Sequence, residues 1–343
     1  MSSSDSSSPR IGVLLNGNAR RVSPRFLPPL QSLLPPEDIC YSQSHEEAND
    51  FLRQMTTQPY DVLLICGGDG TIQETTSAMH RIFAEEDATE RLPAVGVLPL
   101  GTGNAISSVV GGSREPARIV RLVQERYDSL ERKPFRWVVK DKLLSPFAGI
   151  GFDSLLLHCY QQLHKRTKGT IIERLGKGLF GYLVALIFMA IPRQLFTRRP
   201  EITVTNEGKG WALDIHGNRV RELEHGEVLF KGRPLLAGIS TIPCYGYGVR
   251  VFPFVDTGKV MQCRIADLRT LHAVINIPTI WKGTFRHQKL HDFFVEKIKI
   301  ESDKPVPLQV GGDSVGIHQE MELSLSEETT TLLDLQPLLA LKD

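Results

Sequence analysis

The sequence predicts an α/β N-terminal domain with a mostly parallel sheet, followed by a β-rich sandwich domain with a helical insertion. In the first part, apolar runs at 11–15, 61–66 and 94–98 are typical of buried strands, and helix-like stretches alternate with them. From residue 135 onward this alternation gives way to short β-like runs separated by Gly, Pro, Asn and Asp turns. The 343 residues are enough for two domains with separate cores.

Four segments follow from this change of pattern. We expect a disordered polar tail at 1–9, the α/β domain at 10–134, the sandwich at 135–330, and a C-terminal segment at 331–343 that packs back on the first domain. In the first domain, further elements are expected at 23–34, 38–41, 46–55, 72–84 and 115–125. In the second domain, strands are expected at 136–140, 201–205, 249–254, 260–265, 297–301, 308–310 and 321–325, with the helical insertion at 156–192.

Composition excludes several classes of protein. The hydrophobic content of 41% is typical of a globular chain, and a net charge of +1 gives no reason to expect nucleic-acid binding. The five cysteines form no Cys-x-x-Cys pair, which favours reduced thiols over a disulfide framework or a zinc site. The serine-rich tail is not a signal peptide, and the apolar run at 179–191 is shorter than the roughly 20 residues of a bilayer span. We therefore expect a cytoplasmic protein, with peripheral contact to a membrane left open.

Two glycine-rich loops follow two of the predicted buried strands. Gly67-Gly68-Asp69-Gly70-Thr71 comes after 61–66, and Pro99-Leu100-Gly101-Thr102-Gly103-Asn104 comes after 94–98. Loops at the carboxyl ends of parallel strands line the ligand crevice of an open α/β sheet. Glycines in such loops let backbone N–H groups approach a phosphate. The pair of loops therefore predicts a nucleotide-phosphate site.

Asp69 supplies the first loop with a carboxylate, which could hold a metal-bound triphosphate or accept a proton from an attacking hydroxyl. The alternative is a tight turn with no chemical role. Thr71 and Glu74 have capping-box spacing, so the helix that follows is expected to begin at Thr71. Neither a Walker A sequence nor a dinucleotide Gly-x-Gly-x-x-Gly fingerprint occurs, which disfavours both common nucleotide-binding folds.

Taken together, the two loops resemble the catalytic domain of the diacylglycerol kinase, sphingosine kinase and ceramide kinase superfamily, closest in style to compact bacterial lipid kinases. The first motif is shared with NAD kinases, whereas the second is much more specific to lipid kinases. Asn16, at the end of the first strand, is similar to the asparagine that this family places beside the nucleotide, and 147–153 is similar to its segment entering the second domain. The resemblance extends from Arg10 to Leu335.

This resemblance implies an ATP-dependent lipid kinase that transfers the γ-phosphate to a hydroxyl of diacylglycerol, ceramide or a sphingoid base, with Mg²⁺ arriving on the ATP. Asp69 and Asp313 are the implied catalytic residues, and Asp153 is the implied contact to the lipid head group. The implied nucleotide-binding residues are Asn16, Gly67, Gly68, Gly70, Thr71, Gly101, Thr102, Gly103 and Asn104. The implied partner is a lipid at a membrane surface, and a homodimer is left open. Two alternatives stand beside this function: a soluble-substrate kinase similar to NAD kinases, and a non-catalytic paralogue that binds nucleotide or lipid.

Two stretches depart from the family pattern. The family's C-terminal Asp-Gly-Glu is replaced by Gly311-Gly312-Asp313, which could instead be only a hairpin turn. The segment at 252–258 has one acid where many bacterial members carry Asp-Asp-Gly, so we expect no structural metal site.

The stretch at 165–199 is basic, then apolar, then basic, which fits either a helix on an anionic membrane or a core helix with solvated ends.

Overall fold

The computed structural model describes residues 8–339 except Arg20, Thr102 and 170–177. The chain divides into two compact units. Unit 1 comprises the chain up to Phe135 together with the chain from Glu328 onward, and unit 2 comprises Arg136–Glu327.

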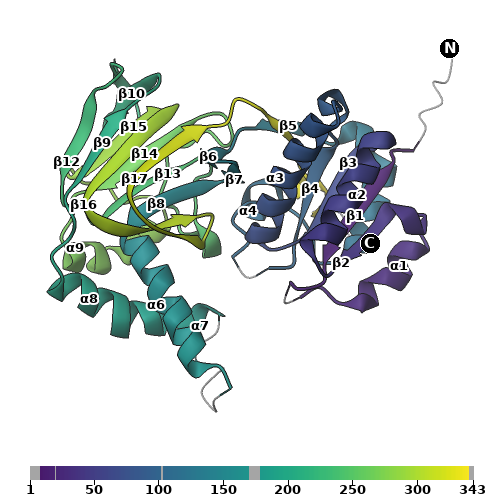
Figure 1. The fold of residues 1–343 in the computed structure, drawn as a ribbon, viewed down its shortest axis with the longest axis horizontal. Helices are drawn as coiled ribbons and strands as arrows, with labels where there is room; N and C mark the ends of the chain where they lie inside the picture. The colour runs from purple at the N-terminus through teal and green to yellow at the C-terminus, as the bar shows by residue number, and fades with distance from the viewer. Residues whose placement is uncertain (1–7, 20, 102, 170–177, 340–343) are drawn as a thin grey trace. The chain divides into compact units, whose positions relative to one another are not determined.

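Unit 1 is built on a six-stranded sheet in which five strands run parallel and only β5 is antiparallel to its neighbour (Figure 1). The runs that form β3 and most of β4 are apolar and buried throughout, as expected for strands covered on both faces. In spatial order the strands are β2 (Ile39–Ser42), β1 (Ile11–Asn16), β3 (Val62–Gly67), β4 (Ala94–Pro99), β18 (Thr330–Leu333) and β5 (Arg132–Phe135).

The helices of unit 1 alternate with these strands along the chain. They are α1 (Leu27–Gln31), α2 (His45–Thr57), α3 (Asp69–Glu85), α4 (Ser107–Val110), α5 (Pro116–Arg126) and α11 (Gln336–Leu339). The expected start of α3 at Thr71 is wrong, because the helix begins at Asp69 and the extended Gly68 is its N-cap. Glu74 is exposed and lies 3.7 Å from the His45 ring, so it does not complete a capping box.

The chain returns to unit 1 after unit 2 and completes its sheet. β18 lies between β4 and β5, with Leu332 opposite Val95 on one side and Lys133 on the other. The buried His80 of α3 holds this return, because its Nε2 lies 2.6 Å from the Thr330 Oγ1. The C-terminal segment therefore supplies a strand inside the sheet, not only a contact against it.

Unit 2 is one continuous twelve-stranded antiparallel sheet. Its main path is β11 (Arg219–Glu222), β10 (Gly210–Leu213), β15 (Leu290–Val295), β14 (Met261–Ala266), β13 (Leu236–Ser240), β8 (Phe147–Gly151), β16 (Lys297–Val310), β17 (Asp313–Leu325), β6 (Val138–Lys140) and β7 (Leu143–Ser145). Off this path, β9 (Ile202–Asn206) pairs with β16 and β12 (Val228–Gly232).

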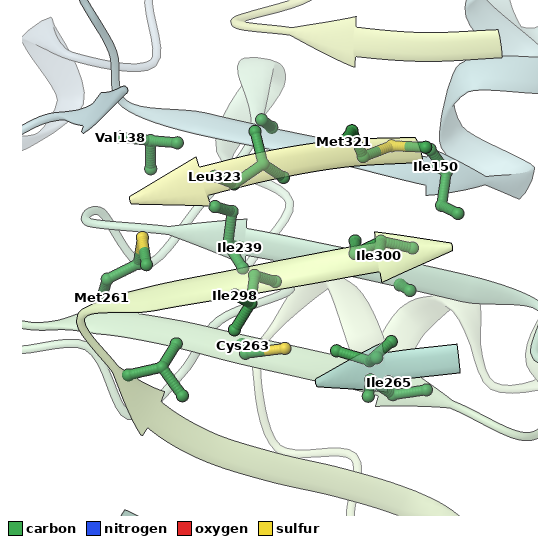
Figure 2. Close-up of a cluster of buried hydrophobic side chains, with 14 of the residues drawn as sticks. Val138, Ile150, Ile239, Met261, Cys263, Ile265, Ile298, Ile300, Met321 and Leu323 are labelled. Atoms are coloured by element: carbon green, nitrogen blue, oxygen red, sulfur yellow. The ribbon is translucent and has the colours of Figure 1, made fainter. Parts of the chain in front are cut away.

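The sheet folds over itself into two layers because β16 belongs to both. Its residues 308–310 pair with β8, whereas 298–302 pair with β9, and the pairing register shifts between the two parts. Apolar side chains from both layers meet in the core, where Figure 2 shows Ile239 and Cys263 with Ile298, Ile300 and Leu323. The predicted sandwich is thus formed by a single sheet, and the separate strands expected at 297–301 and 308–310 are one bent strand.

The strand expected at 249–254 is wrong. The backbone there bonds to loop carbonyls and to side chains instead of a neighbouring strand. The Phe252 N–H donates to the Pro243 carbonyl at 3.0 Å. Arg264 Nη1 donates to the Val251 carbonyl at 2.7 Å, and the Phe254 N–H donates to Gln262 Oε1 at 3.1 Å. Arg264 is buried and pairs with Asp292 through both of its carboxylate oxygens, at 2.7 and 2.9 Å. A buried ion pair therefore holds this segment as a loop.

The helical insertion starts earlier than expected, at the end of β8. It comprises α6 (Phe152–Thr167), α7 (Gly178–Ala185), a π-helical turn (Leu186–Ala190) and α8 (Ile191–Phe196), and two further short helices, α9 (Thr270–Ile275) and α10 (Ile277–Trp281), precede β15. None of the helices in the described residues combines the length and the apolar character that crossing a membrane requires.

Candidate active site

Three loops of unit 1 meet at the carboxyl ends of three adjacent parallel strands, β1, β3 and β4. We number them along the chain: the first loop begins at Asn16, the second is 67–71, and the third is 99–104. The register places Leu15 of β1 beside Cys66 of β3, and Gly67 of β3 beside Pro99 of β4. Each strand therefore ends at the same level, and the residues that follow are brought together whatever their separation in the sequence.

The first loop is tied to the second by a side-chain hydrogen bond. Asn16 Nδ2 donates to Thr71 Oγ1 at 2.8 Å, and Asn16 Oδ1 accepts the N–H of Asn18 at 2.9 Å. Gly67 makes room for the Thr71 side chain, because a Cβ at Gly67 would lie 2.5 Å from Thr71 Oγ1. Two sequence-predicted residues, Asn16 and Thr71, therefore shape the loops directly.

The second loop is in backbone contact with the third. A Cβ added to Gly101 would lie 2.2 Å from the Gly68 Cα, so this approach requires a glycine at 101. The Leu100 N–H also donates to the Gly67 carbonyl at 2.9 Å. The glycines predicted to approach a phosphate thus first serve to bring the two loops against each other.

Asp69 is the first residue of α3 and is half-buried. Its Oδ1 accepts the backbone N–H of Ile106 at 3.3 Å, which links the start of α3 to the chain beyond the third loop. Gly70 is the second residue of the same helix. The first N–H groups of a helix have no intrahelical acceptor and give its N-terminus a partial positive charge, so this end of α3 suits an anion.

The third loop is closed by Asn104, which adopts a left-handed backbone conformation with φ of 52°. Its Nδ2 donates to the Gly101 carbonyl at 3.2 Å. Its Oδ1 is buried and has no hydrogen-bond partner among the described residues, which leaves an acceptor for an additional donor. Gly103 lies in the same loop, whereas the predicted Thr102 lies outside the described residues.

Arg21 is a site residue that sequence reasoning missed. It follows β1 by five positions, and its Nη1 donates to the Gly101 carbonyl at 3.0 Å. Arg21 thereby joins the first loop to the third and adds a permanent positive charge to the described part of these loops. The available signal was a basic pair soon after a strand that ends in Asn, in a protein without a Walker lysine.

In unit 2, Asp153 lies in the first turn of α6, beside two glycines that are paired in the sheet. Gly149 of β8 pairs with Gly238 of β13, and a Cβ at Gly149 would lie 3.2 Å from Asp153 Oδ2. That oxygen accepts hydrogen bonds from the Tyr245 hydroxyl at 3.0 Å and from Gln309 Nε2.

Asp153 has only neutral hydrogen-bond partners among the described residues. Burial raises the pKa of its carboxyl group because it penalises the ionised form, although the bonds from Ser154, Gln309 and Tyr245 act in the opposite direction. Burial, together with the neighbouring Asp153, also raises the pKa of Tyr245. The arrangement holds a carboxyl group that a cationic or hydroxyl-bearing ligand could stabilise.

Asp313 is the first residue of β17 and pairs with Val310 across a tight hairpin. The two turn residues, Gly311 and Gly312, have φ of 59° and 91°, as a type I′ turn requires. The hairpin-turn interpretation of this sequence is therefore correct as far as the backbone is concerned. Asp313 is exposed at the tip, where a carboxylate remains available for chemistry.

Comparison with known proteins relates this geometry to a family. A family model described as the diacylglycerol kinase catalytic domain matches residues 10–130. Over 268 residues the chain is 31% identical to a Streptococcus pneumoniae protein named "Putative lipid kinase", covering 78% of this chain and 76% of that protein. It is also 34% identical over 107 residues to Diacylglycerol kinase 1 of Drosophila melanogaster, covering 31% of this chain and 8% of that one.

Solved structures show the same fold. A diacylglycerol kinase from Bacillus anthracis str. Sterne is similar with a TM-score of 0.63 and 15% identity, covering 96% of this chain and 98% of that one. A second structure, of a protein described as a putative diacylglycerol kinase from the same organism, has a TM-score of 0.62 and 17% identity, covering 95% of this chain and 97% of that one.

The parallel sheet followed by a large antiparallel sheet is therefore the fold of these solved structures. The chain belongs to the diacylglycerol kinase superfamily of lipid kinases.

Proposed function

We propose that this protein is an ATP-dependent lipid kinase, which binds MgATP at the three loops of unit 1 and transfers the γ-phosphate to a lipid hydroxyl. The observation that carries the proposal is the closure of these loops by Asn16 with Thr71, Gly68 with Gly101, and Arg21 with Gly101. Closed loops of this kind, at a helix N-terminus, suit the phosphates of a nucleotide.

In this mechanism the lipid oxygen forms a bond to the γ-phosphorus as the bond to the β–γ bridging oxygen breaks and ADP leaves. Asp69 is the candidate base that accepts the hydroxyl proton, and Asp313 is the candidate acid that orients the hydroxyl. Mg²⁺ enters with ATP as part of the substrate and neutralises phosphate charge. Backbone N–H groups at the start of α3 and the Arg21 guanidinium stabilise the charge on the transferred group.

The direct test is incubation of the full chain with labelled ATP and a panel of diacylglycerol, ceramide and a sphingoid base, followed by chromatography of the lipids. We expect label in at least one lipid. Label transferred to NAD and to no lipid would support the soluble-substrate alternative and contradict the proposal.

The hairpin at Gly311-Gly312-Asp313, which replaces the family's Asp-Gly-Glu, favours one alternative function, that of a non-catalytic binding protein. A protein of this kind would bind ATP at the same loops and transfer no phosphate to any of these lipids. A calorimetric ATP titration, run alongside the lipid panel, separates this outcome from a misfolded preparation.

Arg21 gives the first site prediction. Because a hydrogen bond to a charged group contributes about 1.5–3 kcal/mol, Arg21→Gln should raise the KM for ATP about tenfold or more and leave the KM for the lipid unchanged. The matched control is Arg25→Gln, since the Arg25 guanidinium lies 5.4 Å from the Phe26 ring centroid and not on the loops. Equal KM values for ATP in both variants would contradict the assignment.

Asp153 gives the second site prediction, on the lipid head group. Asp153→Asn should raise the KM for the lipid about tenfold to a hundredfold, because a charge-assisted hydrogen bond to the head group is lost, while the KM for ATP stays the same. Asp256→Asn is the control, since Asp256 is an exposed acid of the same unit that pairs with Lys259 at 3.1 Å. A KM that rises for ATP but not for lipid would overturn the head-group role.

A further inference from the structure

The exposed hydrophobic side chains of this protein are concentrated on the helices of unit 2. Fourteen large hydrophobic side chains are exposed in the described part of the chain. Nine of them lie on α7, the π-helical turn, α8, α9 or α10. Phe196 of α8 is 89% exposed and Ile275 of α9 is 77% exposed. Large apolar side chains gathered in this way mark a surface that another molecule covers.

Two of these helices come from distant parts of the sequence and are fixed to each other. α8 contacts α9, and both appear at the same end of unit 2 in Figure 1. Arg199, just after α8, donates to the Leu268 carbonyl at 2.7 Å and to the hydroxyl of Thr270, the first residue of α9, at 2.9 Å. The guanidinium therefore holds the end of the insertion against the start of α9.

The outward side of this helix pair is apolar. On α9, Leu271 and Ile275 are four residues apart and share one exposed face, whereas Thr270 is buried and Ala273 packs on the core beneath. On α8, Leu195 and Phe196 are exposed at the end of the helix. We call these four side chains the α8–α9 surface.

Charge identifies the kind of partner. The described residues of 154–169, 178–199 and 268–283, which contain α7 to α10 and α6 from its third residue on, carry eight Lys and Arg and no Asp or Glu. Asp153 of α6 and Asp267, which precedes α9, are the acids next to these ranges. Arg198 and Arg269 are exposed and lie next to the two helices in the sequence. Apolar side chains with an excess of cations around them suit the interface of an anionic bilayer, where the apolar side chains enter the acyl region and the cations meet the head groups.

We propose that the α8–α9 surface inserts into anionic membranes. α9, which lies outside the helical insertion in the sequence, provides a second membrane anchor beside α8. The inference deepens the proposed lipid kinase function, because such a surface would hold the protein where its substrate lies. It requires neither ATP nor phosphate transfer, and so it can be tested without them.

The test is sedimentation of the full chain with vesicles of phosphatidylcholine alone or of equal parts phosphatidylcholine and phosphatidylglycerol. Leu271→Ser/Ile275→Ser should lower the partition coefficient about tenfold or more on the mixed vesicles, as expected when two aliphatic side chains no longer enter the apolar phase. Leu195→Ser/Phe196→Ser should do the same. Ile215→Ser/Val220→Ser, which changes two exposed hydrophobic residues elsewhere in unit 2, should bind like the unmodified protein.

The second part of the vesicle experiment tests the contribution of charge. Arg198→Gln/Arg269→Gln should weaken binding to the mixed vesicles roughly fivefold per charge and leave binding to phosphatidylcholine unchanged. Unaltered vesicle binding by the α9 variant, or an equal loss in the Ile215/Val220 control, would overturn the inference. So would a dimer in analytical ultracentrifugation that only the α8–α9 variants dissociate, because a second copy would then be the occupant.

The kinase proposal and the membrane proposal can be contradicted independently. If no lipid is phosphorylated but the α8–α9 variants lose vesicle binding, the membrane proposal is supported and the kinase proposal is contradicted. If lipid in detergent micelles is phosphorylated by a variant that no longer binds vesicles, both stand.

Discussion

Asp69→Asn should lower kcat for lipid phosphorylation about a hundredfold to ten-thousandfold, the range that a general base contributes. The asparagine retains a carbonyl oxygen that can accept the Ile106 N–H, now at 3.3 Å, so the free energy of unfolding should change by less than about 1 kcal/mol. Steady-state turnover measured beside thermal unfolding separates the two effects.

The control for this prediction is Asp61→Asn. Asp61 immediately precedes β3, at the opposite end of the strand from Asp69, and its Oδ2 accepts the Arg10 N–H at 2.8 Å. The same change of charge in the same unit should leave turnover intact. Full activity of Asp69→Asn would show that the Asp69 carboxylate is not the catalytic base.

Gly101→Ala should weaken nucleotide binding while unit 1 stays folded. The new Cβ would lie 2.2 Å from the Gly68 Cα, whereas carbon atoms in contact prefer about 3.5–4.0 Å, so the second and third loops must move apart. The Arg21 and Leu100 bonds across the loops, at 3.0 and 2.9 Å, would be lost with them. A calorimetric titration with ATP should show a Kd that is weaker by about fivefold to a hundredfold, since two hydrogen bonds contribute about 1–3 kcal/mol.

Gly232→Ala is the matched change for this experiment. Its Cβ would meet only the Phe230 ring, at 3.1 Å, in unit 2, and a side chain can move where a backbone cannot. ATP affinity should be unchanged. Equal affinity in Gly101→Ala and the unmodified protein would mean that the contact of the two loops is not needed for the nucleotide.

The sequence predicted the strands of unit 1 well because their signal is local. β1, β3 and β4 are buried apolar runs, and each is followed closely by an asparagine or by a glycine-rich motif that marks its end in the sequence. The start of α3 was harder to predict from the sequence, because two residues that could cap the helix, Gly68 and Thr71, lie within four positions. Gly68 takes the N-cap position, and Thr71 instead accepts the hydrogen bond from Asn16, fifty-five residues away.

The surroundings of Asp153 could not be predicted, because they depend on long-range contacts. Tyr245 and Gln309 reach its carboxyl group from 92 and 156 residues along the chain. The failed strand at 249–254 has the same cause. Its alternation of apolar residues is real, but its backbone bonds to Gln262 and to Arg264, whose charge is balanced by Asp292 of another strand. No local pattern contains that information.

The position of β18 has a consequence for how the protein is made. β18 lies between β4 and β5, and it follows unit 2 in the chain, so the sheet of unit 1 stays incomplete until Leu333 has left the ribosome. The early part of the chain, which contains all three loops, must wait through the synthesis of Arg136–Glu327 with a strand position vacant. Pairing of such distant segments is slow because a long loop must close first. A gene fragment that stops after the glycine loops would therefore encode a sheet with an open edge prone to aggregation, and not a miniature kinase.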